Sequence, residues 1–190
     1  MLPGWLVSIL GPFAFALDRV AQEYAARREL AKADELGKGV SARAGLFIWN
    51  RGRVRLGRNV SIGANVDITC YEGGSVEIGD DVFIGNGCVI ASGKGNVRIG
   101  SDCLIAEGVS IRAGDHGLEP DRPMREQATT VRDIRIGRDV WLAKGVAVLA
   151  GTEIADGCVV GANAVAMGTT EPYGIYVGVP IRKAGDRRQK

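Results

Sequence analysis

The chain has 190 residues, of which 46% are hydrophobic and 24% charged, and its formal net charge is +2. This length suits one domain with a sizeable core, and so small a net charge gives no argument for a nucleic-acid partner. The four cysteines form no CxxC pair and only one histidine is present, which argues against a disulfide framework and a zinc site. We therefore expect no metal and a reducing, cytoplasmic compartment.

The chain begins with a strongly apolar stretch, residues 2–17 (LPGWLVSILGPFAFAL). No basic residue precedes it and no small-residue cleavage pattern follows, so a secretory signal is not predicted. The stretch is also short for a membrane span and is interrupted by Gly11-Pro12.

A helix is predicted over residues 13–36, because Phe13, Leu17, Val20 and Tyr24 recur at helical spacing with charges between them. Glycines at 37 and 39 are expected to end it, so residues 1–37 form an N-terminal segment. Two roles fit this segment. The helix can pack on the open first coil of the repeat described below and cap it, which we favour. Alternatively, residues 2–17 can make a peripheral contact with the inner face of a membrane.

The centre of the chain repeats with a period of six. An aliphatic residue returns at this spacing in five groups of three: Leu56, Ile62, Ile68; Ile78, Ile84, Ile90; Ile99, Ile105, Ile111; Ile136, Leu142, Val148; Ile154, Val160, Ala166. A glycine or another small residue often follows the aliphatic one, and a compact residue stands four positions after it. A period of six fits neither an amphipathic helix nor an alternating strand.

This pattern predicts an all-β solenoid over residues 38–170, with an irregular first coil at 40–55. Three short strands make each coil, the aliphatic residues point inward, and coils stack at strand spacing, about 4.8 Å. We attribute the glycines after the aliphatic positions to the corners, where the chain turns and positive φ is needed.

The spacing between groups predicts one functional edge. It is ten residues from Ile68 to Ile78, nine from Ile90 to Ile99 and twenty-five from Ile111 to Ile136. Insertions at one phase of a solenoid form loops on one side, often the binding side. The largest predicted loop covers residues 112–135. The repeat is expected to stop at Thr169, and residues 171–190 form a C-terminal extension with a basic end. This end is either a solvated, frayed tail or a segment that attracts a polyphosphate ligand.

A distinctive block closes the repeat, from Asp139 to Lys183: DVWLAKGVAVLAGTEIADGCVVGANAVAMGTTEPYGIYVGVPIRK. It resembles the ending of the hexapeptide-repeat acyltransferases, and residues 54–184 are similar to the galactoside, maltose and xenobiotic acetyltransferases and to members that modify polysaccharides. The resemblance implies a left-handed β-helix, although crossovers between parallel strands are otherwise right-handed. It also implies a homotrimer, acetyl-CoA as acyl donor and a saccharide or small-molecule acceptor.

The resemblance assigns the general base to His116, in the sequence Ser110-Ile-Arg-Ala-Gly-Asp-His116 at the mouth of the long loop. Imidazole suits the deprotonation of an attacking hydroxyl, because its pKa lies near working pH. Without the family position, a lone loop histidine would be interpreted as an exposed residue with no role.

The same resemblance places acetyl-CoA along Trp141, Ala143, Lys144, Gly161 and Ala162, with an oxyanion donor among the N–H groups of residues 141–144. Relatives often carry Thr-Lys where this chain has Met167-Gly168. We therefore expect the phosphate contacts from Arg182 or Lys183. The glycines and alanines are equally explained by corner geometry alone.

Four residues are candidates for acceptor binding: Asn86, Asp115, Asp121 and Gln127. Asp115 and Glu119 are also candidates to orient His116. The alternative is a solvated loop that packs on a neighbouring subunit.

The predicted activity is therefore O-acetylation of a sugar or sugar-containing acceptor. N-acetylation of an amino sugar or nucleotide sugar, or O-acetylation of serine, is the alternative within enzymes. A zinc enzyme of the γ-carbonic anhydrase type would need three histidines, and this chain has one. A trimeric scaffold without activity would tolerate the loss of His116.

Overall fold

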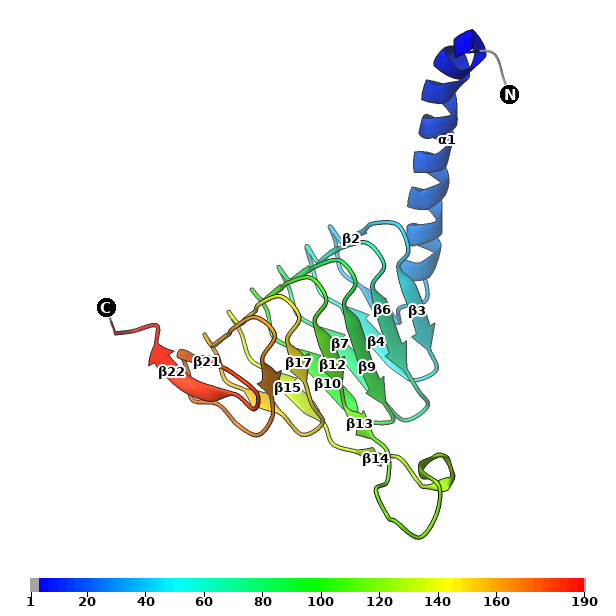
Figure 1. Cartoon of the computed structure of the whole chain (residues 1–190). Helices are drawn as coiled ribbons and strands as arrows, with labels where there is room; N and C mark the ends of the chain where they lie inside the picture. The colour runs from blue at the N-terminus through cyan, green and yellow to red at the C-terminus, as the bar shows by residue number, and fades with distance from the viewer. Residues whose placement is uncertain (1–3, 190) are drawn as a thin grey trace.

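The structure is a computed structural model that describes the backbone of residues 4–189 and the side chains of residues 15–189. It is a three-sided parallel solenoid with one long helix at its N-terminal end (Figure 1), and it matches a left-handed β-helix, as predicted. Each coil contributes one strand to each of three sheets, which we call sheets A, B and C.

Sheet A contains β1 (Glu35–Leu36), β4 (Arg53–Leu56), β7 (Ser75–Ile78), β10 (Asn96–Ile99), β15 (Ile134–Ile136) and β18 (Glu153–Ile154). Sheet B contains β2 (Ser41–Ala42), β5 (Ser61–Ile62), β8 (Phe83–Ile84), β11 (Leu104–Ile105), β16 (Trp141–Leu142), β19 (Val159–Val160), β21 (Gly174–Val177) and β22 (Arg182–Asp186). Sheet C contains β3 (Phe47–Asn50), β6 (Asp67–Cys70), β9 (Val89–Gly93), β12 (Ser110–Arg112), β17 (Ala147–Val148) and β20 (Val165–Ala166). Outside the solenoid wall lie α1 (Gly4–Leu30), the short helix η1 (Met124–Glu126) and the antiparallel pair β13 (Gly114–Asp115) and β14 (Thr130–Val131).

The interior follows the six-residue period. All fifteen aliphatic repeat residues are buried, none more than 4% exposed, and the compact residues four positions later are at most 1% exposed. They stack in register from coil to coil; for example, Ile84 pairs with Ile105 and Ile105 with Leu142. Burial raises the pKa of the inward Cys103 thiol to about 11, so this cysteine behaves as a small core residue.

The corner glycines have a different cause from the one the sequence suggested. Positive φ falls three residues after the aliphatic position, for example at Asn59 (55°) and Asp81 (56°), and not on the glycine that follows it directly. A Cβ on Gly57 would lie 2.6 Å from the carbonyl oxygen of Gly79 in the next coil. These glycines are therefore required by close stacking, whereas Asn, Asp or Gly supplies the left-handed turn.

The first coil is regular and begins at Glu35, so the expectation of an irregular coil over 40–55 was wrong. The predicted helix over residues 13–36 also had the wrong bounds. Helix α1 runs from Gly4 to Leu30, and it ends there because the next residues already belong to the first coil. The Asp34 carboxylate accepts the N–H of Val54 at 2.8 Å and an Asn50 Nδ2–H at 2.9 Å.

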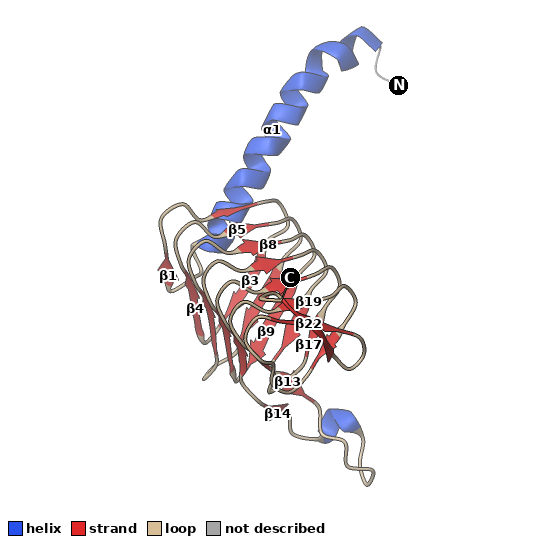
Figure 2. Ribbon diagram, turned by 90° about the vertical axis from the view of Figure 1, so that its left-hand side faces the viewer, coloured by secondary structure: helices blue, strands red, loops and turns tan. Residues whose placement is uncertain are grey.

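Helix α1 caps the first coil only with its last turns. Ala26, Glu29 and Leu30 are buried, while the rest of the helix projects away from the prism (Figures 1 and 2). The Glu29 carboxylate accepts the Ile48 N–H at 2.9 Å and binds Lys32 Nζ at 2.6 Å, which closes the open edge of sheet C. The capping role is thus confined to the end of the helix. Among the described residues, no helix has both the length and the apolarity needed to cross a membrane.

We had expected the C-terminal segment to leave the solenoid at Thr169, and this expectation was wrong. Strand β21 continues sheet B in parallel with β19, and β22 folds back on it. Ion pairs hold the basic end in place: Asp186 binds Arg188 at 2.6 Å, and Arg187 binds Asp139 at 2.9 Å. The Arg188 guanidinium lowers the pKa of Asp186. This segment is therefore a docked cap on the last coil and not a frayed tail.

The Glu29 cap can be tested by its pH dependence. Burial alone would raise the pKa of Glu29, but the hydrogen bonds from the Ile48 N–H and Lys32 lower it overall. Glu29→Ala leaves a buried N–H without an acceptor and should destabilise the fold by about 1–3 kcal/mol at neutral pH. Because the folded pKa is lowered, this contribution is present above the unfolded-state pKa and is lost as pH falls through the folded-state pKa.

Thermal unfolding of wild type and Glu29→Ala between neutral and acidic pH measures this difference. Glu23→Ala, which removes an exposed pair with Arg27, is the matched control and should have little effect. A difference that stays constant down to strongly acidic pH would contradict the proposed cap.

Candidate active site

The insertions all lie at one edge of the prism, as predicted. They follow β6, β9 and β12, where the chain passes from sheet C to sheet A, and the longest protrudes as a loop (Figures 1 and 2). We call this the C–A edge. The other two edges keep the six-residue spacing in the five groups from Leu56 to Ala166. The C–A edge therefore carries the variable part of the molecule.

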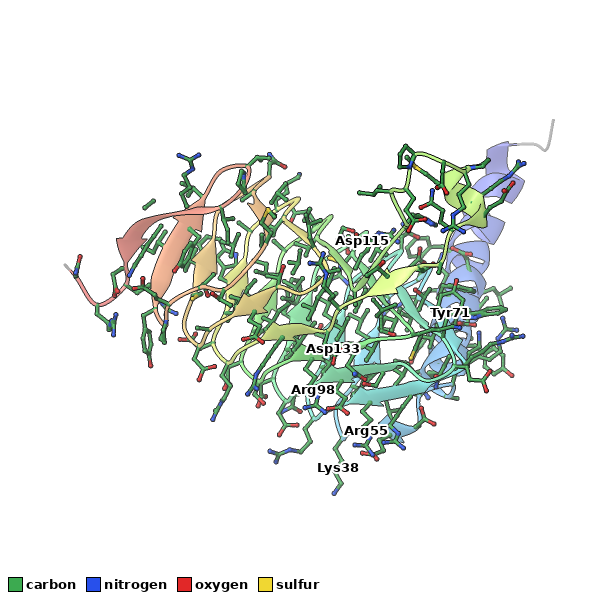
Figure 3. All side chains as sticks on the ribbon, turned by 90° about the horizontal axis from the view of Figure 1, so that it is seen from below. Lys38, Arg55, Tyr71, Arg98, Asp115 and Asp133 are labelled. Atoms are coloured by element: carbon green, nitrogen blue, oxygen red, sulfur yellow. The ribbon has the colours of Figure 1, made fainter. Side chains whose placement is uncertain are left out.

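His116 lies at the base of this loop, directly after β13, and its side chain is exposed. Its neighbour Asp115 accepts a hydrogen bond from Arg132 at 3.2 Å, and Figure 3 shows Asp115 at the base of the loop. The backbone of Arg132 is held in turn by Ala113 (2.9 Å) and Gly151 (3.2 Å). The loop base is thus anchored to the coils, so the position of His116 is defined by the solenoid.

Gln127 closes the loop on itself. Its Oε1 accepts the Glu119 N–H at 2.9 Å, and its Nε2 donates to the carbonyls of Glu119 (2.8 Å) and Arg122 (2.9 Å). The carboxylate of Glu119 pairs with Arg122, and Asp121 is exposed beside the same arginine at 3.8 Å. In the structure Gln127 therefore shapes the loop, and Asp121 is the freer of these two acceptor candidates.

A second feature lies along the B–C edge, where the chain passes from sheet B to sheet C. A groove of about 560 Å³ there is lined by Asn86 and Lys144, together with Asn65, Glu107 and Asn163. Lys144 pairs with Glu107 at 3.4 Å, and the pKa of Glu107 is lowered by its own backbone N–H and by Lys144. The structure thus brings together Asn86, predicted to bind the acceptor substrate, and Lys144, predicted to bind acetyl-CoA, although they lie 58 residues apart in the sequence.

Backbone N–H groups at the corners are satisfied by a recurring device. The residue two positions after the aliphatic one donates its N–H to a side-chain oxygen at the same phase of the next coil. Ala64 donates to Asn86 Oδ1 at 2.8 Å, and Arg138 donates to Asp156 Oδ1 at 2.8 Å. At these corners the N–H depends on the residue one coil further along, whereas among the described residues the N–H groups of Asn86 and Glu107, at the same phase, make no bond to the next coil.

The Lys144 N–H also makes no such hydrogen bond to a side chain of the next coil. The residue at the same phase of the next coil is Ala162, which has no acceptor, and within the described part of the chain the Lys144 N–H donates to nothing. By contrast, Trp141 and Ala143 donate to the carbonyls of Cys158 and Val160, both at 2.9 Å. Of the predicted oxyanion donors, Lys144 thus has an N–H open to the B–C groove.

The basic candidates near the C-terminus differ from each other. Lys183 is bound to Glu171 at 2.6 Å and to Asp186 at 3.6 Å, and the Glu171 carboxylate raises its pKa. Arg182 is exposed and pairs with no acid among the described residues. Arg182 lies on β22. In sheet B this strand is three strands beyond β16, which precedes Lys144, and three strand spacings are roughly 14 Å along the stack.

His116 is not close to the groove of its own chain. Sheet C separates the two edges, and the six residue-to-residue steps from Gly108 to Gly114 span roughly 20 Å of extended chain. One chain therefore presents two half-sites, with the histidine at the C–A edge and the open N–H at the B–C edge.

Sequence reasoning missed Glu107, Asn65 and Asn163 of the groove. The signal that could have found Glu107 is its phase, two residues after Ile105, which it shares with Asn86 and Lys144. Among the described residues no group of His, Cys, Asp or Glu is arranged to hold a metal ion.

Comparison with known proteins agrees with this architecture. The family model for the bacterial transferase hexapeptide (six repeats) matches residues 133–166. The probable acetyltransferase Rv3034c of Mycobacterium tuberculosis is 35% identical over 154 residues, which are 80% of this chain. They are 50% of the relative, so the chain spans about half the length of the curated relative it matches. The chain is a hexapeptide-repeat protein.

Solved structures show the same fold. AntD, an N-acyltransferase from Bacillus cereus solved with dTDP and 3-hydroxybutyryl-CoA, superposes with a TM-score of 0.74 at 23% identity, covering 85% of this chain and 88% of AntD. The polySia-specific acetyltransferase NeuO superposes with a TM-score of 0.65 at 26% identity, covering 80% of this chain and 64% of NeuO.

The open N–H of Lys144 predicts a specific effect of Ala162→Asn. The new side chain places an acceptor one coil above Lys144, as Asn86 does above Ala64. We expect amide exchange at Lys144 to slow by roughly tenfold without loss of thermal stability, because an added hydrogen bond of this kind contributes about 0.5–1.5 kcal/mol.

Hydrogen exchange by NMR measures this rate. Asn86→Ala is the reciprocal control and should accelerate exchange at Ala64. Equal exchange at Lys144 in wild type and Ala162→Asn would show that this N–H is already bonded.

Proposed function

We propose that the protein transfers an acetyl group from acetyl-CoA to a hydroxyl of a sugar-containing acceptor. The observation that carries the proposal is the pair of half-sites: a lone histidine on an anchored loop, and at the B–C edge a backbone N–H, that of Lys144, which has no partner among the described residues. The acetyltransferase name of the Mycobacterium tuberculosis relative and the CoA ligands of the AntD structures support the acyl donor.

Acetyl-CoA fits the B–C edge because small residues leave room along the stack. Gly161 and Ala162 present almost no side chain beyond Lys144, and Arg182 lies further along the same sheet without an acidic partner among the described residues. An elongated donor lying along the stack would have its thioester near Lys144 and its phosphates near Arg182. Arg182 then supplies the contact that Met167-Gly168 cannot, and Lys183 remains in its ion pairs.

The chemistry follows from these positions. His116 accepts the proton of the acceptor hydroxyl while its oxygen attacks the thioester carbonyl, which forms the new C–O bond. The Lys144 N–H stabilises the negative charge that develops on the carbonyl oxygen. The C–S bond then breaks, and the CoA thiolate leaves and takes a proton, which the imidazolium can return.

We further propose that neighbouring copies in a homotrimer complete the site. The two half-sites of one chain are roughly 20 Å apart, so the C–A edge of one copy must lie beside the B–C edge of another. Sheets B and C expose large apolar side chains suited to such contacts, among them Leu104 (53%), Trp141 (48%) and Trp49 (43%). Sheet A carries charged residues instead; Arg55 and Arg98 flank Glu77, and Figure 3 shows both arginines pointing outward.

The acceptor class has a second candidate. AntD is an N-acyltransferase, and two of its structures hold dTDP-4-amino-4,6-dideoxyglucose, so an amino sugar is the alternative acceptor for this chain. The same base-assisted attack serves an amine or a hydroxyl. Thiol release from acetyl-CoA across sugars, nucleotide sugars, amino sugars and serine distinguishes these acceptors, and mass spectrometry identifies the acylated atom.

His116→Ala should lower kcat by roughly a hundredfold or more, because a general base typically contributes 10²–10⁴-fold. Thiol release with the best acceptor of the panel gives the rate, and size-exclusion chromatography with light scattering checks that assembly is unchanged. Lys94→Ala, an exposed change at the same C–A edge, is the matched control and should keep wild-type activity. An unchanged rate in His116→Ala would remove the proposed base.

Mixed assemblies test the division of the site between chains. His116→Ala and Ala162→Asn each remove one half-site, so each alone should be nearly inactive. Chains of both kinds, unfolded and reassembled together in equal amounts, should recover about a quarter of wild-type activity, because one interface in four pairs two intact half-sites. If both half-sites acted within one chain, the mixture would remain as inactive as its components.

A further inference from the structure

Large apolar side chains of α1 from Phe15 to Tyr24 are exposed and not covered by any of the described residues. Phe15, Leu17, Val20 and Tyr24 are 73%, 70%, 64% and 72% exposed, although they are large and apolar. The buried residues of the helix lie within its last turns, and Figures 1 and 2 show the helix leaving the prism. Exposed apolar surface of this extent on one element is typical of an interaction site.

The sequence of the helix divides sharply at residue 17. No charged residue occurs from 2 to 17, whereas Asp18, Arg19, Glu23, Arg27 and Arg28 follow within the next eleven residues. The helical part of the apolar stretch, residues 4–17, is about 20 Å long at 1.5 Å per residue. An apolar segment is thus held at the far end of a helix whose charged half joins it to the prism.

We infer that this segment inserts into one leaflet of a lipid bilayer and anchors the protein there. The occupant is identified by the distribution of apolar residues. Contact with a protein or with a second α1 needs one apolar stripe, for which Leu17, Val20 and Tyr24 have suitable spacing. Residues 2–17, however, carry no charge on any side, and by helical spacing Phe15 lies opposite this stripe, so a helix pair would leave Phe15 in water. Lipid covers all sides at once.

The length decides how the segment is placed in the membrane. A bilayer core is about 30 Å thick, which exceeds the apolar half of α1. The segment therefore reaches into one leaflet, and the charged residues from Asp18 onward remain in the aqueous headgroup region. This anchoring is independent of the proposed acyl transfer, since it uses neither edge that carries a half-site.

Vesicle binding tests the inference with the full chain. The protein should co-sediment with vesicles of phosphatidylcholine, with and without phosphatidylglycerol, and should remain bound at 0.5 M salt, because apolar insertion is not screened. Phe15→Asp/Leu17→Asp should weaken binding by more than roughly tenfold without changing the thermal unfolding of the solenoid. Leu118→Asp, a matched change of an exposed apolar residue on the long loop, should bind as wild type.

Two outcomes would overturn the inference. Wild-type protein that stays in the supernatant with both kinds of vesicle would show that lipid is not the partner. A double variant with fewer subunits than wild type in light scattering, combined with unchanged vesicle binding, would assign the segment to contact between copies.

Discussion

The separation of neighbouring coils, about 4.8 Å, is the constraint on which this molecule depends. At that distance each residue meets its counterpart in the coil above and below, so the same side chain must be acceptable in every layer. Aliphatic residues therefore stack in the interior, and glycine follows them where the next backbone comes within about 2.6 Å of a Cβ, as at Gly57. The stack must also be closed at both ends, which Glu29 does for β3 and β22 does for β21.

The same constraint creates the candidate site at the B–C edge, where the Lys144 N–H is the hydrogen-bond donor. A corner N–H is satisfied only if the next coil offers an oxygen at the right phase, as Asn86 does for Ala64 and Asp156 does for Arg138. Replacing that acceptor with Ala162 leaves the Lys144 N–H without a partner and opens the space above it. An unsatisfied donor is unfavourable for folding, but it is already fixed in direction and needs no reorganisation to stabilise charge. Among the described residues, the Asn86 and Glu107 N–H groups of this edge also make no bond to the next coil, so the Lys144 N–H is distinguished by the small Ala162 that follows it in the stack.

The sequence predicted what the period controls. The inward positions, the solenoid and the single edge with insertions were all apparent, because each depends on spacing along the chain. The cause of the glycines and the extent of the first and last coils were not, since these depend on contacts between layers. The open N–H of Lys144 could not be found either, because its missing acceptor stands 18 residues away. Gln127 stays a predicted acceptor contact; that its amide also holds the loop together is revealed only by the folded loop.

The two edges tolerate change in different ways. Between sheets B and C every corner from Ile62 to Ala166 keeps the six-residue spacing, since an inserted residue there would break the column that ends at Lys144 and Ala162. Between sheets C and A the chain already leaves and rejoins the stack three times without disturbing the register of β12 on β17. Donor binding would thus be fixed by the coils and acceptor choice by the loop that carries His116. Under the proposed function, the acceptor can change through the loop alone while the acyl donor stays the same.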